Sequence, residues 1–245
     1  MNRNRSEAMP LALLIPGLDG TGRLYYRQVE ALKRRYRVLS WSYGEGDGST
    51  LEDLAGELGK ASAGEAPGSV LVVGESFGGM VALAYVLRFP ERVRRLMLVN
   101  AFPYYRRRVR IRLARLLAPL LSLTAARSIK GAIIERVLER EGILEADRQQ
   151  YRDIIDTIDL KGYRHRLRLV QEVDLRPQLA LVAVPTVLLA GGCDKVVPSL
   201  VEARFMAARI PQARVLEFPD AGHALLMTPG VSLAAVDSRQ AELGR

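Results

Sequence analysis

The sequence predicts an α/β fold in which helices cover both faces of a doubly wound, mostly parallel sheet. Three observations lead to this prediction. Short apolar runs alternate with longer stretches of helical periodicity along most of the chain. These runs lack the polar alternation of half-exposed strands, as is typical of strands buried on both faces. Most of them are also followed by Gly, Pro or Asn, which favour turns.

Six of these runs, all rich in Val, Leu or Ile, are predicted to be strands. They are Leu11–Ile15, Tyr36–Trp41, Ser69–Val73, Arg95–Asn100, Thr186–Ala190 and Arg214–Phe218. Amphipathic stretches near residues 22–35, 50–63, 77–89 and 198–209 predict helices between them. Strand–helix–strand units join through right-handed crossovers, so the pattern indicates one parallel sheet with helices on both sides.

Between residues 102 and 178 the pattern is helical only, and four apolar helical faces follow one another. They comprise Val109, Leu113, Leu116, Leu117 and Leu120; Ile129, Ile133 and Val137; Tyr151, Ile154, Ile155 and Ile158; and Tyr163, Leu167 and Val170. A helical insertion between two strands of one sheet is expected to lie over that sheet. We therefore predict a core formed by residues 1–101 and 179–245, and an inserted cap segment formed by residues 102–178.

Composition excludes several classes of protein. The 245 residues are 49% hydrophobic and 26% charged, which excludes a disordered or fibrous chain. The single cysteine, Cys193, excludes a disulfide framework, and two histidines are too few for a multi-histidine metal centre. We therefore predict neither a metal nor a cofactor. No apolar run reaches the length of a membrane span, and no leader is evident, so the expected location is the cytoplasm.

The positive charge is concentrated in one part of the chain. The net charge is +9, and residues 101–178 carry 17 basic and 10 acidic side chains. The arginine-rich stretch from Arg106 to Arg115 has two interpretations. It is either a solvated helix face, or a surface that attracts carboxylate-bearing substrates or makes weak contact with an anionic membrane. Nothing else in the sequence indicates a nucleic-acid-binding module, so nucleic acid is disfavoured as a partner.

The motif with the clearest chemistry is Gly74-Glu75-Ser76-Phe77-Gly78, which lies between a predicted buried strand and a predicted helix. In that context Gly-x-Ser-x-Gly is typical of a nucleophilic serine on a sharp strand-to-helix turn. The turn leaves no room for side chains at Gly74 and Gly78. The N-terminus of the following helix would stabilise negative charge that develops near Ser76.

A serine hydroxyl is a weak nucleophile, so it needs a base and a group that orients the base. His223 follows the last predicted strand and is the better candidate base, because His165 lies among arginines that would oppose its protonation. Asp194, in a glycine loop after the strand that begins at Thr186, is the first candidate for the orienting acid. Asp174 and Asp220 are its rivals.

A tetrahedral oxyanion also needs hydrogen-bond donors. The backbone N–H of Phe77, the residue after the candidate nucleophile, is one. The second is expected from the loop Pro16-Gly17-Leu18-Asp19-Gly20-Thr21-Gly22, with the N–H of Leu18 as the candidate. A dinucleotide-binding loop is the alternative interpretation. The order of the glycines is wrong for it, and no ribose-binding acid follows Trp41.

Taken together, these motifs resemble the α/β-hydrolase superfamily, in particular its serine esterases and lipases. The Pro-Gly loop, Gly-Glu-Ser-Phe-Gly-Gly, Gly-Gly-Cys-Asp-Lys-Val-Val-Pro and Asp-Ala-Gly-His occur in the order Ser, Asp, His that marks that superfamily. The opening loop is similar to a Pro-Gly-x-Asp-Gly-Thr-Gly variant, in which Pro16 stands where a histidine is commoner. The resemblance implies an acyl-enzyme mechanism with Ser76, Asp194 and His223 as triad, and Leu18 and Phe77 as oxyanion donors.

The resulting functional prediction is a hydrolase of carboxylic esters with a short to medium apolar acyl chain, because an apolar cap favours such substrates. The alternative with the same triad is a C–C hydrolase, a lyase or a thioesterase. An alternative of another class is a ligand receptor without catalytic activity, built on the same scaffold.

Overall fold

The structure is a computed structural model that describes residues 9–44, 49–106, 108–109, 112, 132, 134–135, 137–138 and 143–243. Its centre is one sheet in the order β2-β1-β3-β4-β5-β6, with every neighbouring pair parallel. The strands are β1 (Leu11–Ile15), β2 (Arg37–Ser40), β3 (Val70–Glu75), β4 (Val93–Val99), β5 (Thr186–Gly191) and β6 (Ala213–Phe218). The predicted fold class and all six predicted strands are confirmed.

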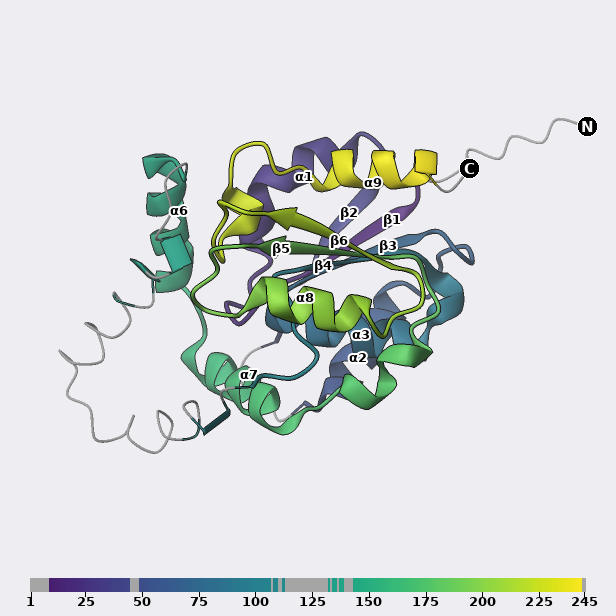
Figure 1. Ribbon diagram of the computed structural model, residues 1–245, viewed down its shortest axis with the longest axis horizontal. Helices are drawn as coiled ribbons and strands as arrows, with labels where there is room; N and C mark the ends of the chain where they lie inside the picture. The colour runs from purple at the N-terminus through teal and green to yellow at the C-terminus, as the bar shows by residue number, and fades with distance from the viewer. Residues whose placement is uncertain are drawn as a thin grey trace, which may run out of the picture.

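Helices cover both faces of the sheet. Helices α1 (Tyr26–Lys33) and α9 (Leu233–Leu243) contact each other on one face, above the sheet in Figure 1. Helices α2 (Leu51–Ala61), α3 (Phe77–Arg88) and α8 (Ser199–Ala207) lie on the other face. Short 3-10 turns complete this part of the chain at η1 (Arg23–Tyr25), η2 (Pro90–Arg92), η4 (Arg176–Leu181) and η5 (Leu225–Met227). The four helices predicted between strands are confirmed.

The two faces of the sheet hold separate hydrophobic cores because side chains alternate along each strand. In β1, Leu11, Leu13 and Ile15 pack with α2, α3 and α8, whereas Ala12 and Leu14 pack with α1 and α9. All five residues are buried, with at most 1% of their surface exposed. A strand that is apolar at every position is therefore the expected result of two covered faces.

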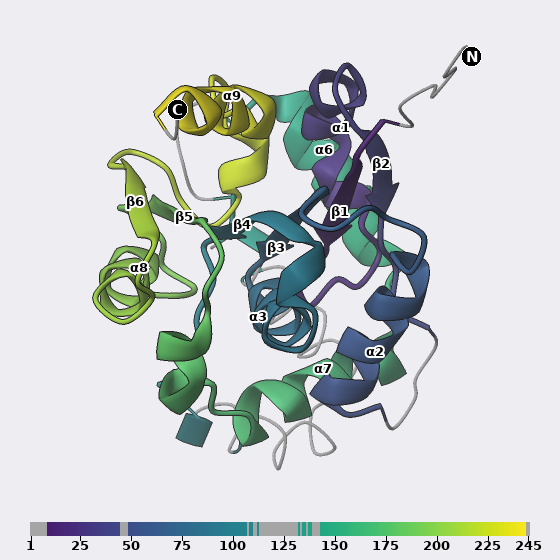
Figure 2. The same cartoon turned by 90° about the vertical axis from the view of Figure 1, so that its right-hand side faces the viewer.

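The cap segment contributes a third cluster. Its helices α6 (Glu145–Asp156) and α7 (Leu160–Glu172) lie in the chain between β4 and β5, and Figure 2 shows them against the core from a second side. Tyr151 and Ile154 of α6 pack with Val137, and they also contact Leu24 and Ala224 of the core. Helix α6 thus packs beside residues that follow the carboxyl ends of β1 and β6. Most of the first two predicted apolar faces, from Leu113 to Ile133, lies outside the described residues.

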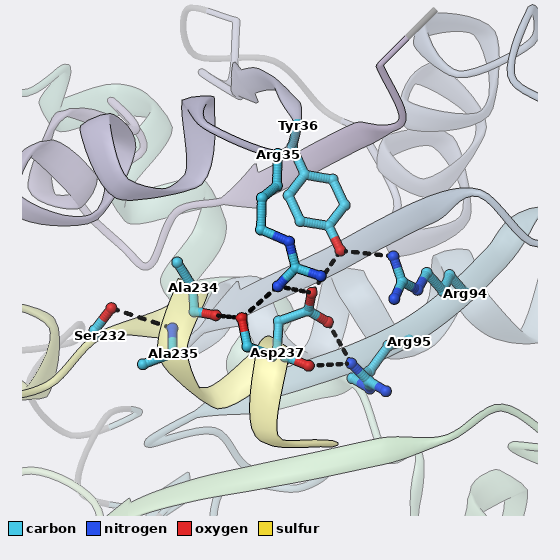
Figure 3. A network of polar contacts seen from close by, with 9 residues as sticks. Arg35, Tyr36, Arg94, Arg95, Ser232, Ala234, Ala235 and Asp237 are labelled. Atoms are coloured by element: carbon cyan, nitrogen blue, oxygen red, sulfur yellow. Dashed lines mark hydrogen bonds and ion pairs between the residues drawn. The ribbon is translucent and has the colours of Figure 1, made fainter. Parts of the chain in front are cut away.

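A buried polar network attaches α9 to the end of the sheet where β2 and β4 begin, opposite the carboxyl ends of the strands (Figure 3). Asp237 is fully buried; it forms an ion pair with Arg95 of β4 and lies 3.5 Å from Arg35. The hydroxyl of Tyr36 donates to Asp237 at 2.6 Å and accepts from Arg94 at 3.0 Å. Burial, followed by the hydrogen bond to Asp237, raises the pKa of Tyr36 to about 12. The network therefore joins three separate segments of the chain.

Candidate active site

Ser76 stands on the turn between β3 and α3 in an unusual backbone conformation. Its φ is 51° and its ψ is −118°, and the residue is 7% exposed. The neighbouring glycines are sterically required: a Cβ added at Gly74 would lie 2.5 Å from the carbonyl oxygen of Gly78, and one added at Gly78 would strike the carbonyl oxygen of Ile15. The turn predicted from the motif is therefore present, and it presents Ser76 at the end of a central strand.

Asp194 and His223, which lie in the loops after β5 and β6, meet beside each other. Nδ1 of His223 lies 2.7 Å from Oδ2 of Asp194, whose side chain is completely buried. The other oxygen of Asp194 accepts from the N–H groups of Val196 and Val197 at 2.8 and 3.0 Å, and the hydroxyl of Ser199 donates to Oδ2. These contacts hold the carboxylate in one orientation toward the imidazole.

The electrostatics of this pair favour a charged acid and a basic imidazole. Burial opposes ionisation of Asp194, but the charge of His223 and the hydrogen bonds outweigh it and hold the pKa of Asp194 below its ordinary value. Burial alone would lower the pKa of His223. The Asp194 carboxylate reverses this effect, so the pKa of His223 lies above its ordinary value. Such a histidine can accept a proton from a hydroxyl group.

Asn100, which the sequence analysis did not single out, fixes the loop that carries His223. It follows β4 with a φ of 46°. Its side-chain amide donates to the carbonyl oxygens of Gly222 and His223 at 3.0 and 2.9 Å, and its oxygen accepts from the N–H of Gly191 at 2.8 Å. One side chain thus connects the ends of β4 and β5 with the histidine loop.

The loop after β1 brings the second candidate donor group close to Ser76. A Cβ added at Gly17 would lie 3.5 Å from the Cβ of Ser76, so the two backbones are adjacent. The N–H of Leu18 donates no hydrogen bond within the described part of the chain. Phe77 is the first residue of α3, a position whose N–H has no partner inside a helix. Leu18 lines the same cavity as Ser76, and Phe77 follows Ser76 directly in the chain.

Arg166 of α7 holds this loop from the cap side. Its guanidinium donates to the carbonyl oxygens of Leu18 at 3.0 Å and Asp19 at 3.3 Å, and it lies over the ring of Tyr43 at 5.4 Å. The residue is only 4% exposed. Gly20, with a φ of 77°, leaves the necessary space, because a Cβ there would lie 2.6 Å from Cζ of Arg166. Helix α7 therefore holds the loop that contains Leu18 through Arg166.

Ser76 and His223 line one cavity of about 480 Å³. Much of its wall is apolar and comes from the cap, namely Ile134, Val137, Tyr151, Ile155, Ile158 and Leu160. The core adds Leu24, Leu226 and Met227. No hydrogen bond joins Ser76 to His223 among the described residues; such contacts are often long when no substrate is bound. The cavity suits a small ligand with an apolar part.

Glu75 is a polar exception in this wall and was not predicted as a site residue. Burial, with a further contribution from the charge of Asp19, raises its pKa to about 8. The one sequence signal for Glu75 is that it directly precedes Ser76, which places it beside the candidate nucleophile.

The other candidates from the sequence lie elsewhere. His165 lies 2.7 Å from the carbonyl oxygen of Ser49 and does not line the cavity. Asp174 pairs with Arg176 at 2.6 Å, and Asp220 is exposed on a turn. Of the three acids considered, it is Asp194 that lies beside His223.

The arginine-rich stretch is described only in part. Arg106 contacts Glu202 at 2.5 Å, and Arg108 donates to the carbonyl oxygen of Val173 and lies 3.8 Å from the ring of Tyr104. Arg112 is exposed, and the remaining arginines up to Arg115 lie outside the described residues. Weak contact of this face with an anionic membrane therefore remains a prediction.

Two further observations concern ligands and membranes. No group of three His, Cys, Asp or Glu side chains in the described ranges could hold a metal ion. Where the helices are described, none is both long enough and apolar enough to cross a bilayer.

Comparison with known proteins places these features in context. The sequence model of the alpha/beta hydrolase family matches residues 12–236. A protein of Yersinia enterocolitica named "putative carbamate hydrolase RutD" is 27% identical over 91% of this chain and 84% of its own length. The protein of the same name from Klebsiella pneumoniae is 28% identical over 89% and 86%.

Solved structures give the same result for the fold. A hydrolase from Pseudomonas aeruginosa is similar with a TM-score of 0.72 and 26% identity, covering 98% of this chain and 88% of that one. An esterase from Exiguobacterium antarcticum has a TM-score of 0.76 at 18% identity, with 97% and 91% covered, which is evidence for the fold alone.

Proposed function

The chain belongs to the alpha/beta hydrolase family, and from that premise we propose that it is a serine hydrolase that cleaves carboxylic esters of short to medium acyl chain. The observation that carries the proposal is the 2.7 Å contact between His223 and Asp194 in the cavity that Ser76 also lines. General hydrolase function agrees with the names of the relatives. The ester substrate and the triad are our proposal.

In the proposed reaction, Oγ of Ser76 attacks the carbonyl carbon while Nε2 of His223 accepts the hydroxyl proton. Asp194 keeps the other imidazole nitrogen protonated and stabilises the imidazolium that forms. The proton then passes to the leaving alcohol, which leaves an acyl group on Ser76. Water, deprotonated by His223, releases the acid and restores the hydroxyl.

The N–H groups of Leu18 and Phe77 are proposed to stabilise the oxyanion of both tetrahedral intermediates. Removing one such donor typically costs about 10²- to 10³-fold in kcat. The support is their position beside Ser76 and the absence of competing acceptors for the Leu18 N–H in the described chain. The apolar wall of the cavity supports a substrate with an apolar acyl part.

Carbamates are a second candidate class, because the curated relatives that match about 90% of the chain carry that activity in their names. A carbamate presents the same kind of carbonyl carbon to a serine nucleophile. It therefore belongs in the same test.

The test is hydrolysis of p-nitrophenyl esters with two to sixteen acyl carbons, together with an N-alkyl p-nitrophenyl carbamate. We expect turnover to peak at a short or medium chain and to fall by more than about 10⁴-fold in Ser76→Ala. Ser69→Ala is the matched control, because Ser69 directly precedes β3 whereas Ser76 directly follows it, so the two serines lie at opposite ends of the strand. It should retain wild-type turnover. Equal activity of Ser76→Ala and wild type would refute the mechanism, as would no turnover of any compound by folded wild type.

A further inference from the structure

Glu75 is a buried carboxyl group in the cavity wall with no assigned partner. The residue is 7% exposed and lines the same cavity as Ser76 and His223. Its Oε2 is buried without a hydrogen-bond partner, and no ion pair to the carboxyl group is present in the described chain. Buried polar side chains are nearly always hydrogen-bonded, so this group indicates a partner that arrives from outside the protein.

The groups around Glu75 favour a neutral carboxyl. Asp19 is a buried acid whose Oδ2 already accepts from the N–H and hydroxyl of Thr21 at 2.9 and 2.7 Å. Burial is the largest cause of the raised pKa of Glu75; the negative charges of Asp19 and Asp194 add to it, and His223 opposes it. From the cap, Tyr151 faces the same cavity, and Arg164 is exposed at its rim. A neutral carboxyl offers one O–H donor and one carbonyl acceptor side by side.

A neutral donor–acceptor pair matches a ligand group of the same kind. A primary amide or a hydroxyl can both donate to and accept from such a carboxyl, whereas a methyl group can do neither. Besides Glu75, the polar groups of the wall belong to Asp19, Ser76, His223, Tyr151, Tyr163 and Arg164, and the rest of the wall is apolar. The position of this group is fixed relative to the reaction, because Glu75 and Ser76 are consecutive residues on one constrained turn.

We propose that Glu75 forms a polar subsite in an otherwise apolar cavity and selects ligands that carry a neutral amide or hydroxyl group beside their apolar part. As a statement about substrates, this inference deepens the proposed function and rests on it. As a statement about binding, it holds whether or not an ester is cleaved.

The binding test uses two probes of equal shape, benzamide and acetophenone, which differ by an NH2 in place of a methyl group. Their dissociation constants are measured by calorimetry on the Ser76→Ala protein, so turnover plays no part. The measured quantity is the preference for benzamide over acetophenone, compared between variants. One hydrogen-bonding group is worth about three- to tenfold in binding. We expect Glu75→Leu to reduce the preference by this factor.

Two variants separate chemistry from packing. Glu75→Gln keeps a donor and an acceptor in the same place and should retain the preference. Glu202→Gln is the matched control, because Glu202 is also a buried acid, 2% exposed, but pairs with Arg106 away from the cavity. If Glu75→Leu does not fold, as judged by its thermal transition, Glu75→Met replaces it.

A turnover test is carried out on wild-type protein with p-nitrophenyl 4-(hydroxymethyl)benzoate and 4-ethylbenzoate. The ratio of their kcat/KM values should also fall about three- to tenfold in Glu75→Leu. An unchanged binding preference in Glu75→Leu, or loss of the preference in Glu75→Gln, overturns the subsite. A preference that depends on Glu75 in a protein that cleaves no ester supports the subsite and refutes the proposed function alone.

Discussion

Ser76 and Asn100 are the two non-glycine residues with positive φ in the described chain, and both directly follow a strand of the sheet. Such conformations cost about 1–3 kcal/mol each and persist where surrounding contacts enforce them. For Ser76 these contacts are the close backbone approaches at Gly74 and Gly78. For Asn100 they are its three side-chain hydrogen bonds. At the residue scale, both strained backbone positions therefore lie at the candidate active site.

Glu75 gives a prediction about pH and stability at the same scale. Its ordinary pKa of 4.5 applies to the unfolded chain, and the folded value is about 8. Between these values the folded state keeps a proton that the unfolded state releases, so the free energy of unfolding falls as pH rises, by about 5 kcal/mol at most. Glutamine cannot ionise and lacks this loss. We therefore expect Glu75→Gln to gain stability over wild type between pH 5 and pH 8.5.

Urea unfolding of both proteins at several pH values measures this gain. The wild type at each pH is the reference for the variant. A difference in unfolding free energy that stays constant from pH 5 to pH 8.5 would contradict the burial of an ionisable Glu75.

At the element scale, α7 connects the cap segment to the loop after β1 through Arg166. We expect Arg166→Met to lower kcat by about tenfold or more, because hydrogen bonds from a charged donor hold the backbone that carries the Leu18 N–H. KM should change little, since Arg166 does not line the cavity. Steady-state kinetics with the best ester of the panel measure both constants.

Arg168→Met is the control for this prediction. Arg168 lies on the same helix, is exposed and pairs with Glu172 at 2.8 Å. Its replacement should leave kcat unchanged. An Arg166→Met enzyme with wild-type kcat would show that the loop keeps its shape without the cap.

The central strands β1, β3 and β5 were predictable from sequence because burial on both faces makes them apolar at nearly every position. Helix α9 was not among the predicted helices. Ser76, Asp194 and His223 could be proposed because each lies in a local motif at a strand end. Arg166 and Asn100 could not, because their partners are more than 90 residues away in the chain.

At the scale of the whole molecule, the candidate site and the Asp237 network lie at opposite ends of the sheet. The site is built after the carboxyl ends of β3, β5 and β6, the usual position in open parallel sheets. The network instead joins α9 to Arg95 near the start of β4 and to Tyr36 before β2 (Figure 3). Substitutions in the Asp237 network should therefore lower stability without changing activity.

Asp237→Ala tests this separation. Removing one partner of a buried ion pair leaves Arg95 uncompensated and typically costs about 3–5 kcal/mol. We expect a loss of that size in urea unfolding, together with an unchanged kcat at a temperature where the variant is folded. Glu57→Ala, at an exposed position of α2, should stay within about 0.5 kcal/mol of wild type. A lower kcat in folded Asp237→Ala would contradict the separation.

Because the cap segment lies between β4 and β5 in the chain, these two paired strands are synthesised at different times. Strand β4 is complete at Val99, but its neighbour β5 ends only at Gly191. At about 5–20 residues per second, a ribosome needs roughly 5 to 20 seconds to make the intervening chain. During that interval the apolar strand β4 lacks its neighbour β5. Arg95 lacks its partner Asp237 for longer, because Asp237 is synthesised after β5. We therefore expect the nascent chain to expose a strand edge that the finished protein covers, and such edges favour aggregation.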